Sequence, residues 1–423
     1  MSYEPSSVLN ILEELMSKAN IQLDLALAAV SIHDVVLAKY VLELKYEVDE
    51  ITNQLFIHTM LSARRPKEAA DNLLFIHMGN LVNFISDVAA NIAEIVVEGI
   101  NPFKDRNNLF LFTHEFVDSA KVGKSSLLIG KSEEELQIQQ ALGIDIMAIK
   151  RDNEILLGYQ HEIKENDHLY LRGPSASVAI FSEVVRGRIT DYQVAKKMLK
   201  QSVVIQSPDE LRPYEQKLLK IINLSTLMID LGFLVQMNPP LGMRDTLREY
   251  EIQIDDLLKE FQKDILKSHQ DGIITQIEAL GLLKFSSEFE MISDAIITMG
   301  LGIRIDKSYM QSVIKEAMST AEDDINLIIV KQNSPYLGKS VREAEIEIVF
   351  SGEVFDIELI KRKNKIIPYP PDNTKIELGD MLVIKSYHNS EGFEEEEEEE
   401  DGDDNENISR QKLTQPLPDK PVK

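Results

Sequence analysis

Apolar residues recur at helical spacing in three long runs at the start of the chain. The runs cover residues 6–30, 34–64 and 67–100, with apolar positions three or four apart along each. Pro66 separates the second run from the third, and Asn101-Pro102 ends the third. Helices of this length would be about 40–50 Å long at about 1.5 Å per residue. Three such helices joined by short turns predict an up-down-up bundle.

The pattern changes near residue 107. Short runs rich in β-branched and aromatic residues follow, and glycines border them, which is typical of strands joined by turns. The expected strands span 109–112, 144–149, 154–157 and 168–171, and one helix is expected at 132–141. We therefore predict a small α+β module after the bundle.

The second half of the chain repeats the first. Residues 44–51 read Leu-Lys-Tyr-Glu-Val-Asp-Glu-Ile, and residues 250–257 read Tyr-Glu-Ile-Gln-Ile-Asp-Asp-Leu. Two shorter motifs also recur: Ile149-Lys150-Arg151 as Ile360-Lys361-Arg362, and Val122-Gly123-Lys124-Ser125 as Leu337-Gly338-Lys339-Ser340. A repeat of this length indicates a duplicated two-part unit.

The second unit predicts the same order of elements. We expect helices at 211–237, 242–269 and 273–303, a helical connector at 304–322, and strands at 326–330, 354–360 and 381–384. Pro239-Pro240 and Asp271-Gly272 mark the turns between these helices. The predicted fold is a multidomain α+β chain, in which bundles at 1–104 and 187–323 alternate with α+β modules at 105–186 and 324–388. A disordered acidic tail is expected at 389–423.

Composition narrows the class of protein. The chain has 423 residues, of which 43% are hydrophobic and 27% charged, as in soluble globular proteins. It has no cysteine, which fits a cytoplasmic location, and its start lacks a signal peptide pattern. No stretch reads as a membrane span, so direct membrane insertion is not expected.

Charge is strongly negative. The net charge is −26, and the tail from Asn389 onward contributes 13 acids against 4 bases. This balance argues against nonspecific binding to nucleic acid, which requires a positive surface. The tail has two interpretations, as a solvating segment or as one that docks on a basic partner.

Four carboxylates in the second bundle form a pattern with chemical meaning. Glu251 and Asp255 lie four residues apart, as do Glu290 and Asp294, so each pair shares one helix face. The two pairs are symmetric about Gly272, where the turn is predicted, so all four would meet at one level of a helical hairpin. Clustered carboxylates are costly unless a cation offsets them, and oxygen ligands suit magnesium, manganese or iron, with zinc as an alternative. The other interpretation is that they lie on solvated faces.

The first bundle provides an internal comparison. Its corresponding residues are Lys45, Asp49, Asn83 and Asp87, which are symmetric about Pro66. Two acids are replaced by Lys and Asn, so a lysine ammonium can offset the remaining charge. We therefore expect a degenerate, metal-poor site in the first bundle.

The duplicated unit resembles two known families. The helical units with paired acid-x-x-x-Asp motifs resemble PhoU-type domains, in which such carboxylates ligate metal. The modules resemble the C-terminal ligand-binding subdomain of RCK/TrkA proteins, through the Gly-Lys-Ser and Ile-Lys-Arg motifs and Asp167 and Asp380 before the last strands. That resemblance implies a dimer or higher assembly and a small anionic ligand, such as a cyclic dinucleotide. The residues it assigns to the ligand are Ile146, Lys150, Arg151, Lys361 and Arg362. The alternative for the Lys-Arg pairs is exposed charge at a strand end.

The resemblance implies a cytoplasmic, non-enzymatic regulator of a potassium or other cation channel or transporter. The transporter would be a separate membrane subunit that brings the chain to the membrane periphery. A second hypothesis is a metal-binding regulator of phosphate transport or signalling. A metal-dependent phosphohydrolase is a distant third, because the sequence offers no nucleophile or general base beyond the carboxylates.

Overall fold

The computed structural model describes most of the chain before the acidic tail. The described residues are 7–104, 107–113, 116–132, 144–157, 161–173, 175–191, 194, 198, 211–237, 243–300, 324–349, 355–363 and 365–386. Several predicted features lie outside these residues: nearly all of the helix at 132–141, the turn at Pro239-Pro240, the connector at 304–322 and the tail from 389.

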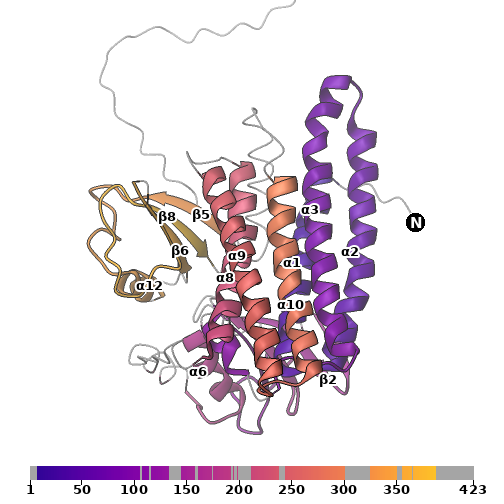
Figure 1. Cartoon of the computed structure of the whole chain (residues 1–423), viewed down its shortest axis with the longest axis vertical. Helices are drawn as coiled ribbons and strands as arrows, with labels where there is room; N and C mark the ends of the chain where they lie inside the picture. Colours follow the sequence, from indigo (N-terminus) through magenta and orange to yellow (C-terminus); the bar gives the residue numbers. More distant parts are fainter. Residues whose placement is uncertain are drawn as a thin grey trace, which may run out of the picture. The chain divides into compact units, whose positions relative to one another are not determined.

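Three long helices form the first bundle (Figure 1). They are α1 (Val8–Ile32), α2 (Val35–Ser62) and α3 (Pro66–Val97), and each packs against the other two. The Asp34 carboxylate caps α2 by accepting the amides of Val36 and Leu37, and Pro66 occupies the first turn of α3. The predicted run boundaries therefore agree with the helices to within a few residues.

The second bundle repeats this arrangement with α8 (Pro213–Met237), α9 (Met243–Gln270) and α10 (Gln276–Ala295). Gly272 has a φ of 72° at the turn between α9 and α10, a conformation that favours glycine. Thr275 and Glu278 then form a capping box that starts α10. Within the predicted helix at 273–303, α10 passes into a π-helical turn, η3 (Ile296–Gly300), and residues 301–303 lie outside the described residues.

Two small antiparallel sheets accompany the bundles. Sheet 1 has the order β1-β4-β2-β3, and sheet 2 has the order β5-β8-β6-β7. Their strands are β1 (Phe116–Lys121), β2 (Asp145–Arg151), β3 (Glu154–Leu156), β4 (His168–Gly173), β5 (Asp324–Ile329), β6 (Phe355–Arg362), β7 (Lys365–Pro368) and β8 (Met381–Ser386). Helix α6 (Ser175–Val185) contacts β1 and β4, and α12 (Val341–Val349) contacts β6. The described residues thus form an α+β fold, with two three-helix bundles and two four-stranded sheets.

The first predicted strand is wrong. Residues Asn107–Phe112 form a 3₁₀ helix, η1, and the first strand of sheet 1 is β1. Tertiary packing explains the difference, because the Phe110 ring lies edge-on to Phe103 at 4.8 Å and to Phe285 at 6.3 Å. The sequence pattern does not predict β1, because polar residues interrupt its apolar positions. It does not predict β7 either, because that strand leads into a proline-rich turn.

The predicted alignment of the two Gly-Lys-Ser motifs is also wrong, by seven residues. Gly338 corresponds to Gly130, not Gly123: both have φ near 80° and both donate an amide hydrogen bond to an isoleucine carbonyl, Ile376 or Ile163. Gly123 has a different role, since a Cβ there would lie 2.2 Å from the Arg186 carbonyl oxygen. The repeat therefore pairs Gly-Lys-Ser at 130–132 with 338–340.

A buried basic residue ties each sheet to the first helix of its bundle. Arg172 of β4 lies 2.6 Å from Asp24 of α1 and 3.2 Å from Asp145 of β2. In the second unit, Lys385 of β8 lies 3.9 Å from Asp230 of α8 and directly opposite Asp356 of β6. Arg172 and Lys385 are both nearly inaccessible to solvent. The duplication has therefore kept a buried cation paired with an acid of the first helix at each junction.

The two bundles pack through their third helices. The Asn91 amide of α3 donates to Glu288 of α10 at 2.9 Å, and Lys284 pairs with Glu98 at 2.6 Å. Gly281 permits the approach, because a Cβ there would lie 2.6 Å from a methyl carbon of Ile100. This contact positions α10, which carries two of the candidate carboxylates.

Two helical segments, Asn72–Val97 and Pro213–Val235, are long and apolar enough to cross a membrane by length and composition. Their most apolar windows are 56% and 83% buried inside the protein, and core helices of soluble proteins pass the same test.

Candidate functional site

The apolar stripes of α9 and α10 place the candidate carboxylates beside the seam of the hairpin. On α9, Tyr250, Ile254 and Leu258 are buried, so Glu251 and Asp255 lie one position away from the packed stripe. On α10, Phe289 and Ile292 are buried, which places Asp294 at the same rim.

Three of the four predicted carboxylates come together. Oxygen atoms of Glu251, Asp255 and Asp294 all lie within 4.8 Å of one another, and we call these three residues the carboxylate cluster. Glu251 and Asp255 are partly buried and Asp294 is exposed. Glu290 lies outside this group, although it is partly buried and close enough to sense the charge of Asp255 and Asp294.

The carboxylates at this site repel one another, and their pKa values are raised. Burial raises the pKa of the Glu251 carboxyl, and the charges of Asp255 and Asp294 raise it further. The pKa of Glu290 is raised by the same three causes. Burial and then Asp255 raise the pKa of Asp294. The metal-free cluster therefore holds its negative charge at a cost that a bound cation would relieve.

One lysine approaches the cluster from solvent. Lys259 lies 3.3 Å from Asp255 and 3.8 Å from Asp256, and 62% of its side chain is exposed. Solvent screens an exposed ion pair of this kind, so Lys259 offsets the repulsion only in part.

The first bundle has a cation built into the same position. The Lys45 ammonium lies 2.9 Å from Asp87 and 3.2 Å from the Asn83 amide oxygen, and it also contacts Asp49. Its side chain is only 15% exposed. As the sequence pattern predicts, the lysine lies between the two aspartates. In the second bundle Glu251 replaces it.

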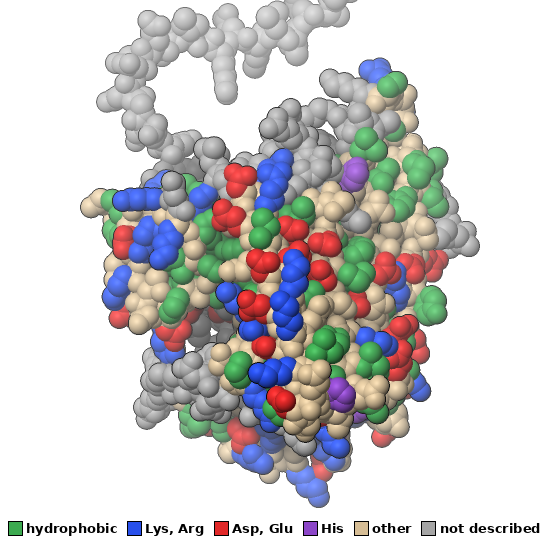
Figure 2. Space-filling model, in the orientation of Figure 1, with side chains coloured by type: hydrophobic (Ala, Val, Ile, Leu, Met, Phe, Trp, Pro, Cys, Tyr) green, Lys and Arg blue, Asp and Glu red, His purple; other side chains and the backbone are tan. Residues whose placement is uncertain are grey.

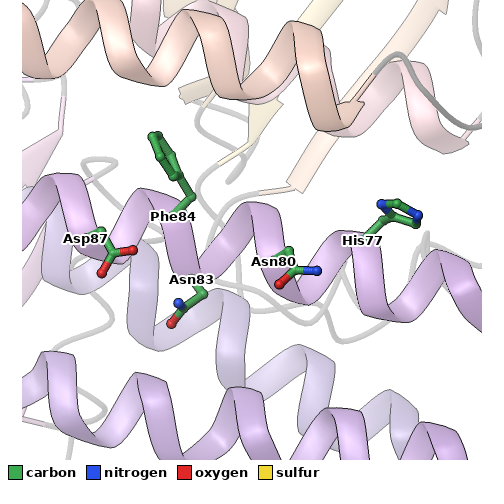
Figure 3. A pocket seen from close by; sticks show the side chains of 5 residues that line it. All are labelled: His77, Asn80, Asn83, Phe84 and Asp87. Atoms are coloured by element: carbon green, nitrogen blue, oxygen red, sulfur yellow. The ribbon is translucent and has the colours of Figure 1, made fainter.

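A hollow along α3 adjoins this lysine (Figure 3). His77, Asn80, Asn83, Phe84 and Asp87 line it. Figure 3 shows His77 at one end and Asp87 at the other, with Phe84 directed away from Asn83. The sequence pattern did not single out Asn80, and it did not assign His77 to a site. The signal that places the five residues on one side of α3 is their succession along the helix in steps of three or four residues.

The carboxylate cluster has a donor set that fits a hard divalent cation. Ligand oxygens around magnesium lie about 2.1 Å from the metal, so two of them are at most about 4.2 Å apart. The 4.8 Å limit on the cluster is slightly wider, and a rotation about the χ angles of the exposed Asp294 and of the partly buried Glu251 and Asp255 would close that difference. Glu251, Asp255 and Asp294 would hold the metal, with Glu290 close enough to stabilise its charge.

The residues assigned to an anionic ligand are occupied by protein contacts. The Lys150 ammonium lies 2.5 Å from Asp34, whose carboxylate also accepts the Tyr170 hydroxyl at 2.8 Å. Burial raises the pKa of the Asp34 carboxyl, but the hydrogen bonds from Lys150, Tyr170 and Leu37 outweigh it and lower the pKa overall. Ile146 is buried in sheet 1. Lys150 thus docks sheet 1 on the N-terminus of α2.

The two arginines of the repeated Ile-Lys-Arg motif clamp a loop in each sheet. Arg151 makes two hydrogen bonds to Asp167, at 2.8 and 2.6 Å, and Arg362 makes two to Asp380, both at 2.8 Å. Both aspartates are nearly fully buried. Lys361 and Arg362 lie in sheet 2 and the other three predicted residues in sheet 1, so the five do not form one site.

Comparison with known proteins does not assign the chain to a family. No family model matches the chain, and no curated protein matches it. Neither the PhoU-type nor the RCK C-terminal resemblance therefore has family-level support.

Among solved structures, the chain has a distant similarity to the RCK domain of the GsuK channel. That structure is 12% identical, with 65% of this chain and 61% of the other covered and a TM-score of 0.16. The GsuK channel itself is 11% identical, covering 65% and 50%, and the GsuK channel bound to NAD is 10% identical, covering 71% and 63%, each with a TM-score of 0.16. The chain spans between half and slightly less than two thirds of these structures.

Proposed function

We propose that this chain is a non-enzymatic regulator of cation transport whose second bundle binds a divalent cation. The observation that supports the cation site is a difference between the two bundles: the position that Lys45 occupies in the first bundle is occupied by Glu251 in the second. The first bundle supplies its own cation between two aspartates, and the second bundle replaces that cation with another acid. The balance of charge at the second site then requires a cation from solution.

Magnesium and manganese suit the site best. Its ligands are carboxylate oxygens, which favour hard cations, and thiolates are absent from the chain altogether. Iron and zinc are the remaining candidates.

Binding of the cation would affect sheet 2 through the helices of the second bundle. Helix α8 packs against α9 and carries Asp230, the partner of Lys385 in sheet 2. The Tyr369 hydroxyl also donates to the Asn223 carbonyl of α8 at 2.8 Å. A cation that draws α9 and α10 together would thus act on the helix that holds sheet 2.

The proposed partner is a membrane channel or transporter subunit for potassium or another cation. The motif resemblance of the sheets to RCK C-terminal subdomains supports this choice, and with it a cytoplasmic, dimeric or larger assembly. The same resemblance supports a cyclic dinucleotide or another small anion as a second input. Regulation of phosphate transport is the second candidate, because the cluster is the feature that PhoU-type domains share.

Metal analysis and transport assays test the two parts separately. Purified chain dialysed against manganese should retain it, and Asp255→Asn with Asp294→Asn should abolish retention. The matched control is Asp256→Asn with Asp271→Asn, which removes two exposed acids from the same hairpin. The control variant should retain metal as the wild type does, and a wild-type chain that retains no more metal than Asp255→Asn/Asp294→Asn contradicts the cation site.

Transport distinguishes the candidates. Cells lacking the chain should show altered rubidium uptake, with phosphate uptake unchanged, and the Asp255→Asn/Asp294→Asn variant should fail to restore it. Altered phosphate uptake alone would favour the second candidate and contradict the first.

A further inference from the structure

One end of sheet 2 exposes lysines and large apolar side chains together. Strand pairing places Ile329, Lys361 and Met381 side by side, so the ends of β5 and β6 and the start of β8 meet there. Figure 2 shows Lys and Arg side chains gathered over this sheet. We call this surface the basic end, and its exposed lysines and large apolar residues are Lys331, Lys363, Lys365, Lys375, Ile329 and Leu378.

The basic end has an excess of positive charge in a chain whose net charge is −26. Arg362 pairs with both acids of the loop before β8, lying 2.6 Å from Glu377 and 2.8 Å from Asp380. These two acids are therefore neutralised without the lysines. Within the described part of the chain, three exposed lysines of the basic end make no ion pair: Lys331, Lys363 and Lys365.

Two aliphatic side chains project between these lysines. Ile329 is 53% exposed and Leu378 is 58% exposed. The loop that carries Leu378 lies against the end of β5, because the Gly379 amide donates to the Val330 carbonyl at 2.9 Å and the Val330 amide donates to the Asp380 carbonyl at 2.8 Å. Exposed apolar and basic side chains thus share one small surface.

Sheet 1 has the opposite charge at the same turn. Asp152 and Glu154 of the β2–β3 turn correspond to Lys363 and Lys365 of the β6–β7 turn, since both turns follow the repeated Ile-Lys-Arg motif. The backbone is alike, because Asp152 has a φ of 48° and Lys363 a φ of 56°. The fold therefore accepts acids here, and the lysines of sheet 2 are not a structural requirement.

The apolar residues differ between the sheets in the same way. Glu165 lies two residues before Asp167, where sheet 2 has Leu378 two residues before Asp380. Asp167 and Asp380 correspond because each is held by the arginine of the repeated motif. An exposed acid in sheet 1 thus stands where sheet 2 exposes a leucine.

We propose that the basic end of sheet 2 binds the surface of an anionic lipid membrane. The negative potential of such a surface attracts nearby lysines, and aliphatic side chains between them enter the boundary between headgroups and acyl chains. Charges act over about 8–10 Å at physiological salt, so the lysines in contact outweigh acids elsewhere in the chain. A soluble polyanion would use the same lysines but would place Ile329 and Leu378 beside charged groups.

The position of the basic end on sheet 2 suits contact with a flat surface. Strands β5 and β6 begin at Asp324 and Phe355, and both of these residues pair with Ser386, where β8 ends. The connections of sheet 2 to the rest of the chain therefore leave from the opposite end of the sheet. The basic end contains no residue of the carboxylate cluster, so membrane binding and metal binding are measured independently.

Co-sedimentation of the full chain with vesicles tests the proposal. The chain should sediment with vesicles of phosphatidylcholine and phosphatidylserine in equal parts, and not with phosphatidylcholine alone. The variant Lys363→Asp/Lys365→Glu/Leu378→Glu gives sheet 2 the residues of sheet 1. Each lysine near an anionic surface strengthens binding about fivefold, so this variant should bind at least about 25-fold more weakly. A wild type that does not bind phosphatidylserine vesicles, or a variant that binds as the wild type does, would overturn the proposal.

The matched control is Lys220→Asp/Lys263→Glu/Leu280→Glu, which changes the net charge equally at exposed positions of α8, α9 and α10. It should bind vesicles as the wild type does, and an equal loss would mean that net charge alone decides binding, which contradicts a specific surface.

The substitution Leu378→Ser separates a membrane from a soluble polyanion, because it leaves the charge unchanged. It should weaken vesicle binding several-fold and leave binding to heparin unaltered. Heparin binding that is lost in the triple basic-end variant, together with no vesicle binding, would mean that the partner is a soluble polyanion and would refute the membrane.

Discussion

The substitution Glu251→Lys transfers the built-in cation of the first bundle to the second. In the first bundle the Lys45 ammonium contacts Asp49 and Asp87. A lysine at 251 would face Asp255 and Asp294 in the same way, because the duplicated helices place these residues at corresponding positions. We therefore expect the variant to stabilise the metal-free chain and to abolish metal binding.

The expected gain in stability depends on how exposed to solvent the paired aspartate side chains are. Asp255 retains about a third of its side-chain exposure, and Asp49 and Asp87 retain nearly half. Two ion pairs at this exposure contribute about 0.2–1 kcal/mol each. Loss of the repulsion that raises the pKa of Glu251 adds to this gain in the same direction. At about 2–4 °C per kcal/mol, the expected rise in melting temperature is about 1–8 °C.

Thermal unfolding with EDTA and with manganese measures both effects. Manganese at about a hundred times its dissociation constant should stabilise the wild type by about 2.7 kcal/mol, and should leave Glu251→Lys unchanged. Glu249→Lys, an exposed charge reversal two residues away, is the control. A lower melting temperature for Glu251→Lys in EDTA, or a retained response to manganese, would refute the reasoning.

Three further predictions concern the duplication, the junctions and pH. Lys45→Glu combined with Asn83→Glu should create a second metal site and lower the metal-free melting temperature, and calorimetric titration with manganese would reveal the added site. Arg172→Met should destabilise the chain by about 3–5 kcal/mol in urea unfolding, because it leaves two buried acids without their shared cation, and Lys124→Met is the exposed control. Without metal, stability should rise as pH falls towards the ordinary pKa values of Glu and Asp, 4.5 and 3.8. The sign follows because the raised pKa values of Glu251 and Asp294 make the folded chain bind more protons than the unfolded chain in that window. Equal slopes for wild type and Glu251→Gln in EDTA would contradict it.

The helical part of the fold could be predicted because its signals are local. Apolar spacing defines the helices, and Pro66 and Gly272 define two turns. The same turns fix which residues face each other across each hairpin, so the meeting of Glu251 with Asp294 follows from counting along the chain.

The sheet contacts could not be predicted, because their partners are distant in sequence. Lys150 pairs with Asp34 and Arg172 with Asp24, each more than a hundred residues away. Arg151 reads as an exposed strand-end charge until Asp167 is placed beside it. Likewise, the run at 109–112 has strand composition, and only its packing against Phe285 makes it helical.

Anomalous diffraction from crystals soaked in manganese tests the central claim most directly. The account predicts one strong peak between the carboxylate oxygens of Glu251, Asp255 and Asp294, and none beside Lys45. A peak beside Lys45, or manganese bound elsewhere while the carboxylate cluster shows none, would contradict it.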